Sequence, residues 1–227
     1  MARRPRGVIV HAVVHVTARG NRGSPIFMDE GDYRAFLRDL QDLCGQHGAR
    51  VQAYCLMTNH LHLLVQVGER PLSPVMRALL HRHARRINRL YYGGGHVFGD
   101  RFWSRPCTSE SDVLSTIRYI HANPVEAGLV DAPDAYPWSS HRIYLGQEEA
   151  PWVSTSALEF FSADRARAQA AYAVWMAGGL SEAGAKGGTG RPRPYGGAGI
   201  GPARRTRHSA GSQEYPSTYE NTAAPPA

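Results

Sequence analysis

Strand-patterned and helix-patterned segments follow one another along this chain in an order that few folds accommodate. The β-branched or alternating pattern of a strand occurs four times, at residues 8–17, 50–57, 60–67 and 98–107. Apolar residues at helical spacing occur between the first and second of these strands and between the third and fourth, at residues 29–47 and 71–92. The order strand–helix–strand–strand–helix–strand predicts an α+β, ferredoxin-like (RRM-like) fold, in which an antiparallel sheet carries helices on one face and leaves the other face for a site.

Capping and helix-breaking residues indicate where the helices begin and end. Asp29 or Asp32 is expected to cap the first helix, and Ser109 or Ser111 a further helix after the last strand. Pro124 should stop that further helix, because the residue before a proline disfavours the helical conformation.

Composition divides the chain into three parts. Residues 1–147 contain the strand and helix pattern, ending in an aromatic segment at 136–145 that should pack across the body. Residues 148–177 are expected to form a C-terminal helical extension, with a last helix near residues 156–176. Gly, Pro, Ala, Ser and Thr dominate residues 178–227, so this part is expected to be a disordered basic tail.

The chain carries 26 Lys and Arg against 19 Asp and Glu, a net charge of +7. Such a balance indicates a polyanionic partner, nucleic acid rather than membrane, although solubility alone would also explain it. No segment has the length of a membrane span, and the basic, apolar start lacks the features of a signal peptide. Three cysteines without metal-ligand spacing suit a reducing cytoplasm.

The pair His60 and His62 begins a predicted strand, where residues two apart point to one face. Two neighbouring imidazoles offer a bidentate site for a divalent ion; the alternative is a pair of part-exposed strand histidines without a ligand. His15 alternates onto the first strand and could share this face, in a structural role or in support of metal or DNA. The pair His81 and His83 lies on a predicted helix, so the rings diverge, and we interpret it as part of a solvated basic face.

Tyr119 lies on the helix predicted after the last strand, from which it could reach across the open sheet face. A divalent cation could assist a tyrosine nucleophile by polarising a phosphate. Asn123 follows four residues later on the same helix face and could offer a third, oxygen ligand beside His60 and His62. His121 competes for that role but is turned away from Tyr119. For an isolated tyrosine, packing in the core is the alternative.

Arginines and aromatic residues on several elements are candidates for contacts with DNA. The loop after the first strand, the second long helix and the last strand together contribute Arg19, Arg22, Arg77, Arg82, Arg85, Arg86, Arg89, Arg101, Phe102, Trp103 and Arg105. Arginine binds phosphate bidentately, and aromatic rings stack on unpaired bases. The alternative for each arginine is a solvated surface charge, and for each aromatic residue a place in the core.

Several segments, in order, resemble the REP-associated tyrosine transposases and related single-tyrosine HUH transposases. They are HVTARGNRGSPIF (15–27), AYCLMTNHLHLLVQ (53–66), GDRFWSR (99–105), IRYIHANPVEAGLV (117–130) and YPWSSHRIYLG (136–146). The resemblance implies that His60 and His62 bind Mg²⁺ or Mn²⁺ and that Tyr119 attacks single-stranded DNA to form a 5′-phosphotyrosine. Asn123 occupies the place from which such enzymes offer a third polar ligand. Single-stranded or hairpin DNA is the implied partner, met in the cytoplasm at the nucleoid.

The resemblance has departures and leaves alternatives open. Some family members read the hairpin base with a Gly-Thr-Gly motif, where residues 18–23 here are ARGNRG, and Trp103 stands where relatives often have a lysine-containing run. The alternatives are a domesticated nucleic-acid-binding protein, a replication-initiator or relaxase-type nickase, and a structural metal protein. Both a monomer and a homodimer are compatible with the resemblance.

Overall fold

The computed structural model describes residues 10–185 of the chain, with side chains up to residue 178. The tail predicted for residues 178–227 therefore lies outside the described residues from residue 186 onward. Residues 178–185 belong to a long helix, α5 (Arg165–Ala185). No helix in the described part is both long enough and apolar enough to cross a membrane.

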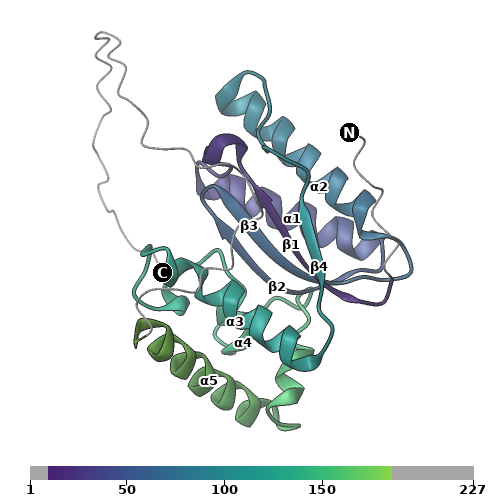
Figure 1. The fold of residues 1–227 in the computed structure, drawn as a ribbon. Coiled ribbons are helices and arrows are strands. Elements are labelled where there is room, and N and C mark those ends of the chain that lie inside the picture. Colours follow the sequence, from purple (N-terminus) through teal and green to yellow (C-terminus); the bar gives the residue numbers. More distant parts are fainter. Residues whose placement is uncertain (1–9, 186–227) are drawn as a thin grey trace, which may run out of the picture. The chain divides into compact units, whose positions relative to one another are not determined.

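A four-stranded antiparallel sheet forms the centre of the fold (Figure 1). Its strands are β1 (Val13–Arg19), β2 (Arg50–Met57), β3 (His60–Gln66) and β4 (Trp103–Pro106). They lie in the order β2-β3-β1-β4, so β1 and β3 are central and β4 forms an edge. Together with the two helices between the strands, this arrangement confirms the ferredoxin-like prediction.

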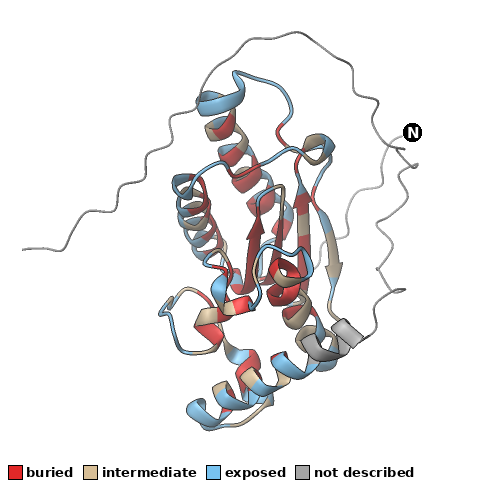
Figure 2. Cartoon of the chain, turned by 90° about the vertical axis from the view of Figure 1, so that its left-hand side faces the viewer, coloured by how far each residue is buried: buried red, intermediate tan, exposed pale blue. Residues whose placement is uncertain are grey.

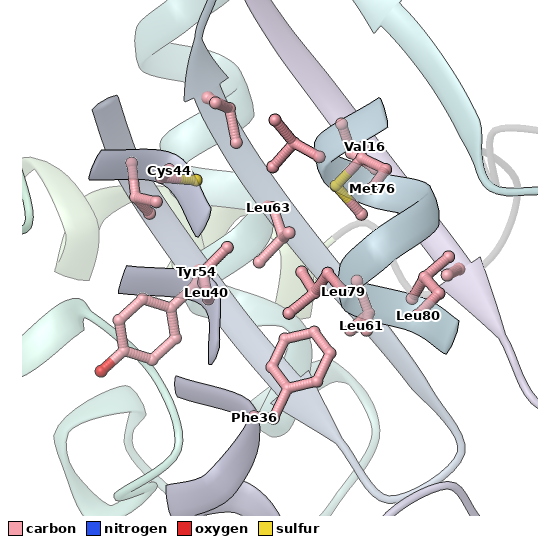
Figure 3. Packing of buried hydrophobic residues seen from close by; sticks show 14 of the residues in the cluster. Val16, Phe36, Leu40, Cys44, Tyr54, Leu61, Leu63, Met76, Leu79 and Leu80 are labelled. Carbon is pink, nitrogen blue, oxygen red and sulfur yellow. The ribbon is translucent and has the colours of Figure 1, made fainter. Parts of the chain in front are cut away.

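Two helices, α1 (Glu30–Gln46) and α2 (Leu72–Ile87), pack against one face of the sheet. Alternate residues of the central strands, including Val16, Leu61 and Leu63, meet apolar side chains of both helices there (Figure 3). A capping box between Asp29 and Asp32 starts α1. The fully buried Asp32 carboxylate also accepts a 2.7 Å hydrogen bond from Arg86 of α2, which joins the two helices.

The opposite face of the sheet is covered in part by α3 (Glu110–Glu126), α4 (His141–Tyr144) and α5. Leu64 of β3 packs with Ile117 and Ile120 of α3 and with Tyr172 of α5 in a second buried cluster. Figure 2 shows the buried inner sides of these elements and their exposed outer sides. The sheet is thus packed on both faces, and α3 runs beside the surface on which the predicted site lies.

Two local predictions are wrong. Helix α3 does not stop at Pro124 but continues to Glu126, because a proline in the last turn removes only one N–H donor and the next residues keep helical geometry. The side chain of His83 is not part of a solvated face: it is 2% exposed and its Nε2 lies 2.6 Å from the Ile26 carbonyl oxygen. The 3.6-residue period that separates His83 from His81 turns it inward, toward α1.

Candidate active site

His60 and His62 project from the start of β3 onto the face opposite α1 and α2. Their ring centroids are 5.0 Å apart and their planes nearly perpendicular. The ring of Tyr119, on α3, lies 5.3 Å from that of His62. Asn123 donates to the Tyr119 carbonyl oxygen at 2.7 Å, and its side chain lies close enough to both imidazoles and to the Tyr119 phenol to influence their pKa values. Strand alternation and one helical turn therefore bring all four predicted residues together.

In both His60 and His62, the Nδ1 atom lies within hydrogen-bonding distance of neighbouring side chains. Nδ1 of His60 lies 2.7 Å from the Asn59 side-chain oxygen. Nδ1 of His62 lies 3.1 Å from Nε2 of His15 and 3.3 Å from the Thr17 hydroxyl. Each ring thus has Nδ1 engaged by the protein, which leaves Nε2 as the nitrogen available to an ion.

Burial keeps the groups at this site uncharged near neutral pH. Desolvation, with the nearby His15 and His60, lowers the pKa of His62 well below its ordinary value. Desolvation and the Arg19 charge lower the pKa of His60, an effect that the Asn123 hydrogen bond opposes. Desolvation raises the pKa of the Tyr119 phenol, again opposed by Asn123. Neutral imidazoles are the form that binds metals, whereas the neutral phenol is a weak nucleophile that needs activation.

The donor set at this site fits a divalent cation that accepts nitrogen and oxygen. Within the described residues no three His, Cys, Asp or Glu side chains are grouped so that they could hold a metal ion. The set consists instead of two imidazoles, His60 and His62, with the amide of Asn123 facing both. Imidazole nitrogens and an amide oxygen are donors that divalent cations accept in proteins.

His15 is the site residue that sequence reasoning left without a definite role. Its ring stacks on His62 at 5.4 Å and meets the edges of Trp103 at 5.8 Å and Tyr119 at 5.9 Å. Burial, together with the Arg105 charge, lowers the pKa of His15 to about 4. The only sequence signal for this role was the alternation of β1, because the contact with His62 depends on the pairing of β1 with β3.

Helix α3 is fixed to α5 and to the segment before α4 by hydrogen bonds and a cation–π contact. The fully buried His121 hydrogen-bonds to the Tyr172 hydroxyl and to the Ser140 hydroxyl, both at 2.7 Å. The Arg118 guanidinium lies 3.6 Å from the centre of the Trp175 ring and donates to the Trp175 carbonyl oxygen at 2.8 Å. His121 is therefore a structural residue, and the position of Tyr119 depends on C-terminal elements.

Comparison with known proteins identifies the family of this chain. A model of the family described as "Transposase IS200 like" matches residues 8–123, just over half of the chain. The chain belongs to the IS200-like transposase family. The match ends at Asn123, so it includes every residue of the candidate site.

Individual relatives of this IS200-like transposase carry related names. A Haemophilus influenzae protein named as a REP-associated tyrosine transposase is 28% identical over 119 residues, which cover 47% of this chain and 68% of the relative. The solved structure of a REP-associated tyrosine transposase bound to a REP hairpin has 17% identity and a TM-score of 0.56, covering 68% of this chain and 98% of its own. Because only 17% of the residues are identical, the likeness to this solved structure is evidence for the fold alone.

Most of the predicted DNA-contacting residues of this IS200-like transposase fall into two groups in space. Of the others, Arg22 lies in the 3-10 turn Asn21–Gly23, and Arg101 and Phe102 come directly before β4. Arg19, at the end of β1, pairs with His60 across the sheet, and Trp103 on β4 is 41% exposed beside His15. Arg105 also lies on this face but forms a bidentate pair with Asp112 at 2.7 and 2.9 Å. The second group lies on or near α2, away from the histidines, and comprises Arg77, Arg82, Arg85, Arg86 and Arg89.

Proposed function

We propose that this chain is a single-strand DNA endonuclease and strand transferase that uses Tyr119 as its nucleophile. The observation that supports this most is the convergence of the Tyr119 ring with His60, His62 and Asn123 on one patch of the sheet. A nucleic-acid-binding module would need no phenol beside two Nδ1-anchored imidazoles. The membership in a transposase family supports the same reaction.

The proposed reaction is a transesterification at one phosphodiester of the strand. The Tyr119 oxygen forms a bond to phosphorus, the bond from phosphorus to the 3′-oxygen breaks, and a 5′-phosphotyrosine results. The phenol releases its proton and the departing 3′-oxygen takes one up. No external energy source is required, because one phosphate ester bond replaces another of similar free energy. Attack by another 3′-hydroxyl reverses the step and joins a new strand.

The chain's own residues orient this reaction. Asn123 holds the Tyr119 backbone carbonyl and side chain, and so keeps the phenol beside the two histidines. His60, His62 and the Asn123 amide would hold a Mg²⁺ or Mn²⁺ ion, which supplies polarisation of the phosphate when bound. His15, Thr17 and Asn59 engage the Nδ1 atoms of the two histidines, which leaves both Nε2 atoms for the ion.

The proposed substrate is single-stranded DNA that carries a hairpin. The net charge of +7 and the hairpin bound by the solved structure of similar fold support this class. Residues 18–23, ARGNRG, differ from the Gly-Thr-Gly motif that some relatives have, so the hairpin read by this chain need not be a REP hairpin.

The test is formation of a covalent protein–DNA conjugate. The chain is incubated with Mn²⁺ and a pool of labelled hairpin strands with randomised flanks, then run on a denaturing gel. We expect a conjugate with wild type and with Tyr92→Phe, an exposed control, but none with Tyr119→Phe or with a chelator. A conjugate formed by Tyr119→Phe would refute the assignment of the nucleophile.

A further inference from the structure

A hollow of about 800 Å³ lies between α2 and the segment 95–102 that leads into β4. Figure 1 shows this segment beside α2. Basic and imidazole side chains line the hollow: Arg77, His81, Arg85, His96 and Arg101. Asp100 is its only acidic lining residue, so arginines outnumber carboxylates there by three to one.

The arginines of the hollow differ in their pairing from four arginines elsewhere in the fold. Arg34, Arg82, Arg86 and Arg105 each form an ion pair with a carboxylate. In the part of the chain that the structure describes, the ion pairs found involve none of the three guanidinium groups in the hollow. These groups are exposed, and an external anion could pair with them without displacing a carboxylate.

The spacing of the nitrogen-bearing side chains on α2 favours a polyanion over a single small anion. Arg77, His81 and Arg85 follow one another at four-residue intervals along α2, so they share one helix face. Four residues advance a helix by about 6 Å, which spreads the row over about 12 Å. Arg101 faces this row from the segment on the other side. Successive phosphates of a nucleic-acid strand match such a row.

The apolar floor of the hollow favours a strand with unpaired bases. Leu80, Val97, Phe98 and Phe102 line it between the basic groups, and Phe98 is partly exposed. A base in a duplex presents its edge rather than its face, whereas an unpaired base can lie flat against apolar and aromatic side chains. Charge and floor together therefore suit single-stranded nucleic acid.

The edge strand β4 connects the hollow to the candidate active site. Phe102 lines the hollow, and the next residue, Trp103, contacts His15 on the active-site face. Because β4 is the edge of the sheet, a strand of nucleic acid can pass around it from one face to the other. The path is short, since a packed sheet layer is about 10 Å thick.

We propose that this hollow binds the single-stranded DNA that flanks the scissile phosphate, after the strand has passed Trp103 and the edge of β4. The proposal rests on the proposed function for the identity of the strand. It assigns Arg77, Arg85 and Arg101 to the backbone of that strand and leaves Arg82 and Arg86 to structural ion pairs with α1.

Binding can be tested apart from cleavage, in the Tyr119→Phe background with chelator. The probes are a fluorescent thymidine dodecamer and a duplex of the same length. We expect Arg77→Gln with Arg85→Gln to weaken dodecamer binding at least about tenfold and to lower the slope of log affinity against log salt by about 1.4, or 0.7 per lost contact. The control, Arg34→Gln with Arg38→Gln, removes the same charge from exposed positions of α1 outside the hollow and should change affinity less than about threefold.

The possible results distinguish a failure of the DNA-binding assignment from a failure of the proposed cleavage reaction. Equal losses in both double variants, unchanged binding in the hollow variant, or tighter binding of the duplex than of the dodecamer would each overturn the assignment of the hollow. A wild-type chain that forms no conjugate with any strand, yet binds the dodecamer through the hollow, would refute the proposed function and leave the hollow assigned.

Discussion

His15 is the side chain on which the orientation of His62 depends. Its Nε2 lies 3.1 Å from Nδ1 of His62 in a buried contact, and the two rings stack. A partner of this kind fixes the tautomer and direction of a metal-binding imidazole, and its loss commonly weakens metal affinity 10- to 100-fold. We therefore expect His15→Ala to raise the Mn²⁺ concentration for half-maximal DNA cleavage by about that factor, at unchanged fold.

The measurement is a Mn²⁺ titration of conjugate formation, with far-UV circular dichroism to verify folding. His11→Ala is the matched control, because His11 lies on the same segment but is exposed. A His15→Ala chain that needs no more Mn²⁺ than wild type would show that Thr17 alone orients His62.

The periodicity of single strands and helices predicts the neighbours of some site residues but not of others. The two-residue repeat of a strand places His60 and His62 on one face, and one helical turn places Asn123 with Tyr119. The contact of His15 with His62 could not be obtained in this way, because it depends on the register between β1 and β3. His83 shows the same limit: the helical period separates it from His81, but only the packing of α2 on α1 determines which of the two is buried.

At the scale of elements, α5 determines where α3 holds Tyr119. The Tyr172 hydroxyl is bonded to Nδ1 of His121 at 2.7 Å and to Nδ1 of His141 at 2.8 Å, all within the core. Tyr172→Phe leaves two buried nitrogens without this partner, so we expect the free energy of unfolding to fall by about 2–4 kcal/mol. We also expect slower conjugate formation, because α3 carries both the Tyr119 nucleophile and Asn123.

Urea unfolding and conjugate-formation rates measure the two effects of Tyr172→Phe. Tyr92→Phe serves as the control, since its hydroxyl is bonded only to the Pro25 carbonyl oxygen in an exposed position. If Tyr172→Phe had the stability and the conjugate-formation rate of the wild type, α5 would contribute nothing to the placement of α3.

The elements themselves were predicted better than the contacts between them. Capping by Asp29 and Ser109 is local chemistry, and both residues cap their helices as expected. The four-residue strand β4 is shorter than the pattern at 98–107 predicted, because regular pairing with β1 covers only Trp103–Pro106 and an isolated bridge joins Phe98 to Gly20. The attachment of α3 to α5 joins residues more than fifty positions apart, and no local pattern encodes it.

At the scale of the whole molecule, packing on both faces of the sheet buries an unusual set of histidines. Five of them are at most 6% exposed: His15, His62, His83, His121 and His141. Desolvation lowers the pKa of every one, to about 4 for His15 and His141. The fold therefore requires these imidazoles to stay neutral.

Acid should destabilise the fold well above the pH at which its carboxylates are protonated. An unfolded histidine binds its proton near pH 6.5 and a buried one only near pH 4, so between these values the unfolded state binds more protons. The stability that the buried neutral histidines contribute is thus fully present above pH 6.5 and is lost as the pH drops toward 4. His141 contributes at most about 3 kcal/mol to the free energy of unfolding. Tyr172 and His121 lie beside it, and the Asp134 charge partly opposes the lowering of its pKa.

Urea unfolding of metal-free protein at several pH values between 7.5 and 4.5 would measure how the free energy of unfolding depends on pH, and His141→Gln should make that dependence weaker. Stability that stayed constant from pH 7 to 5 would contradict the burial of neutral histidines on which both the core and the candidate site depend.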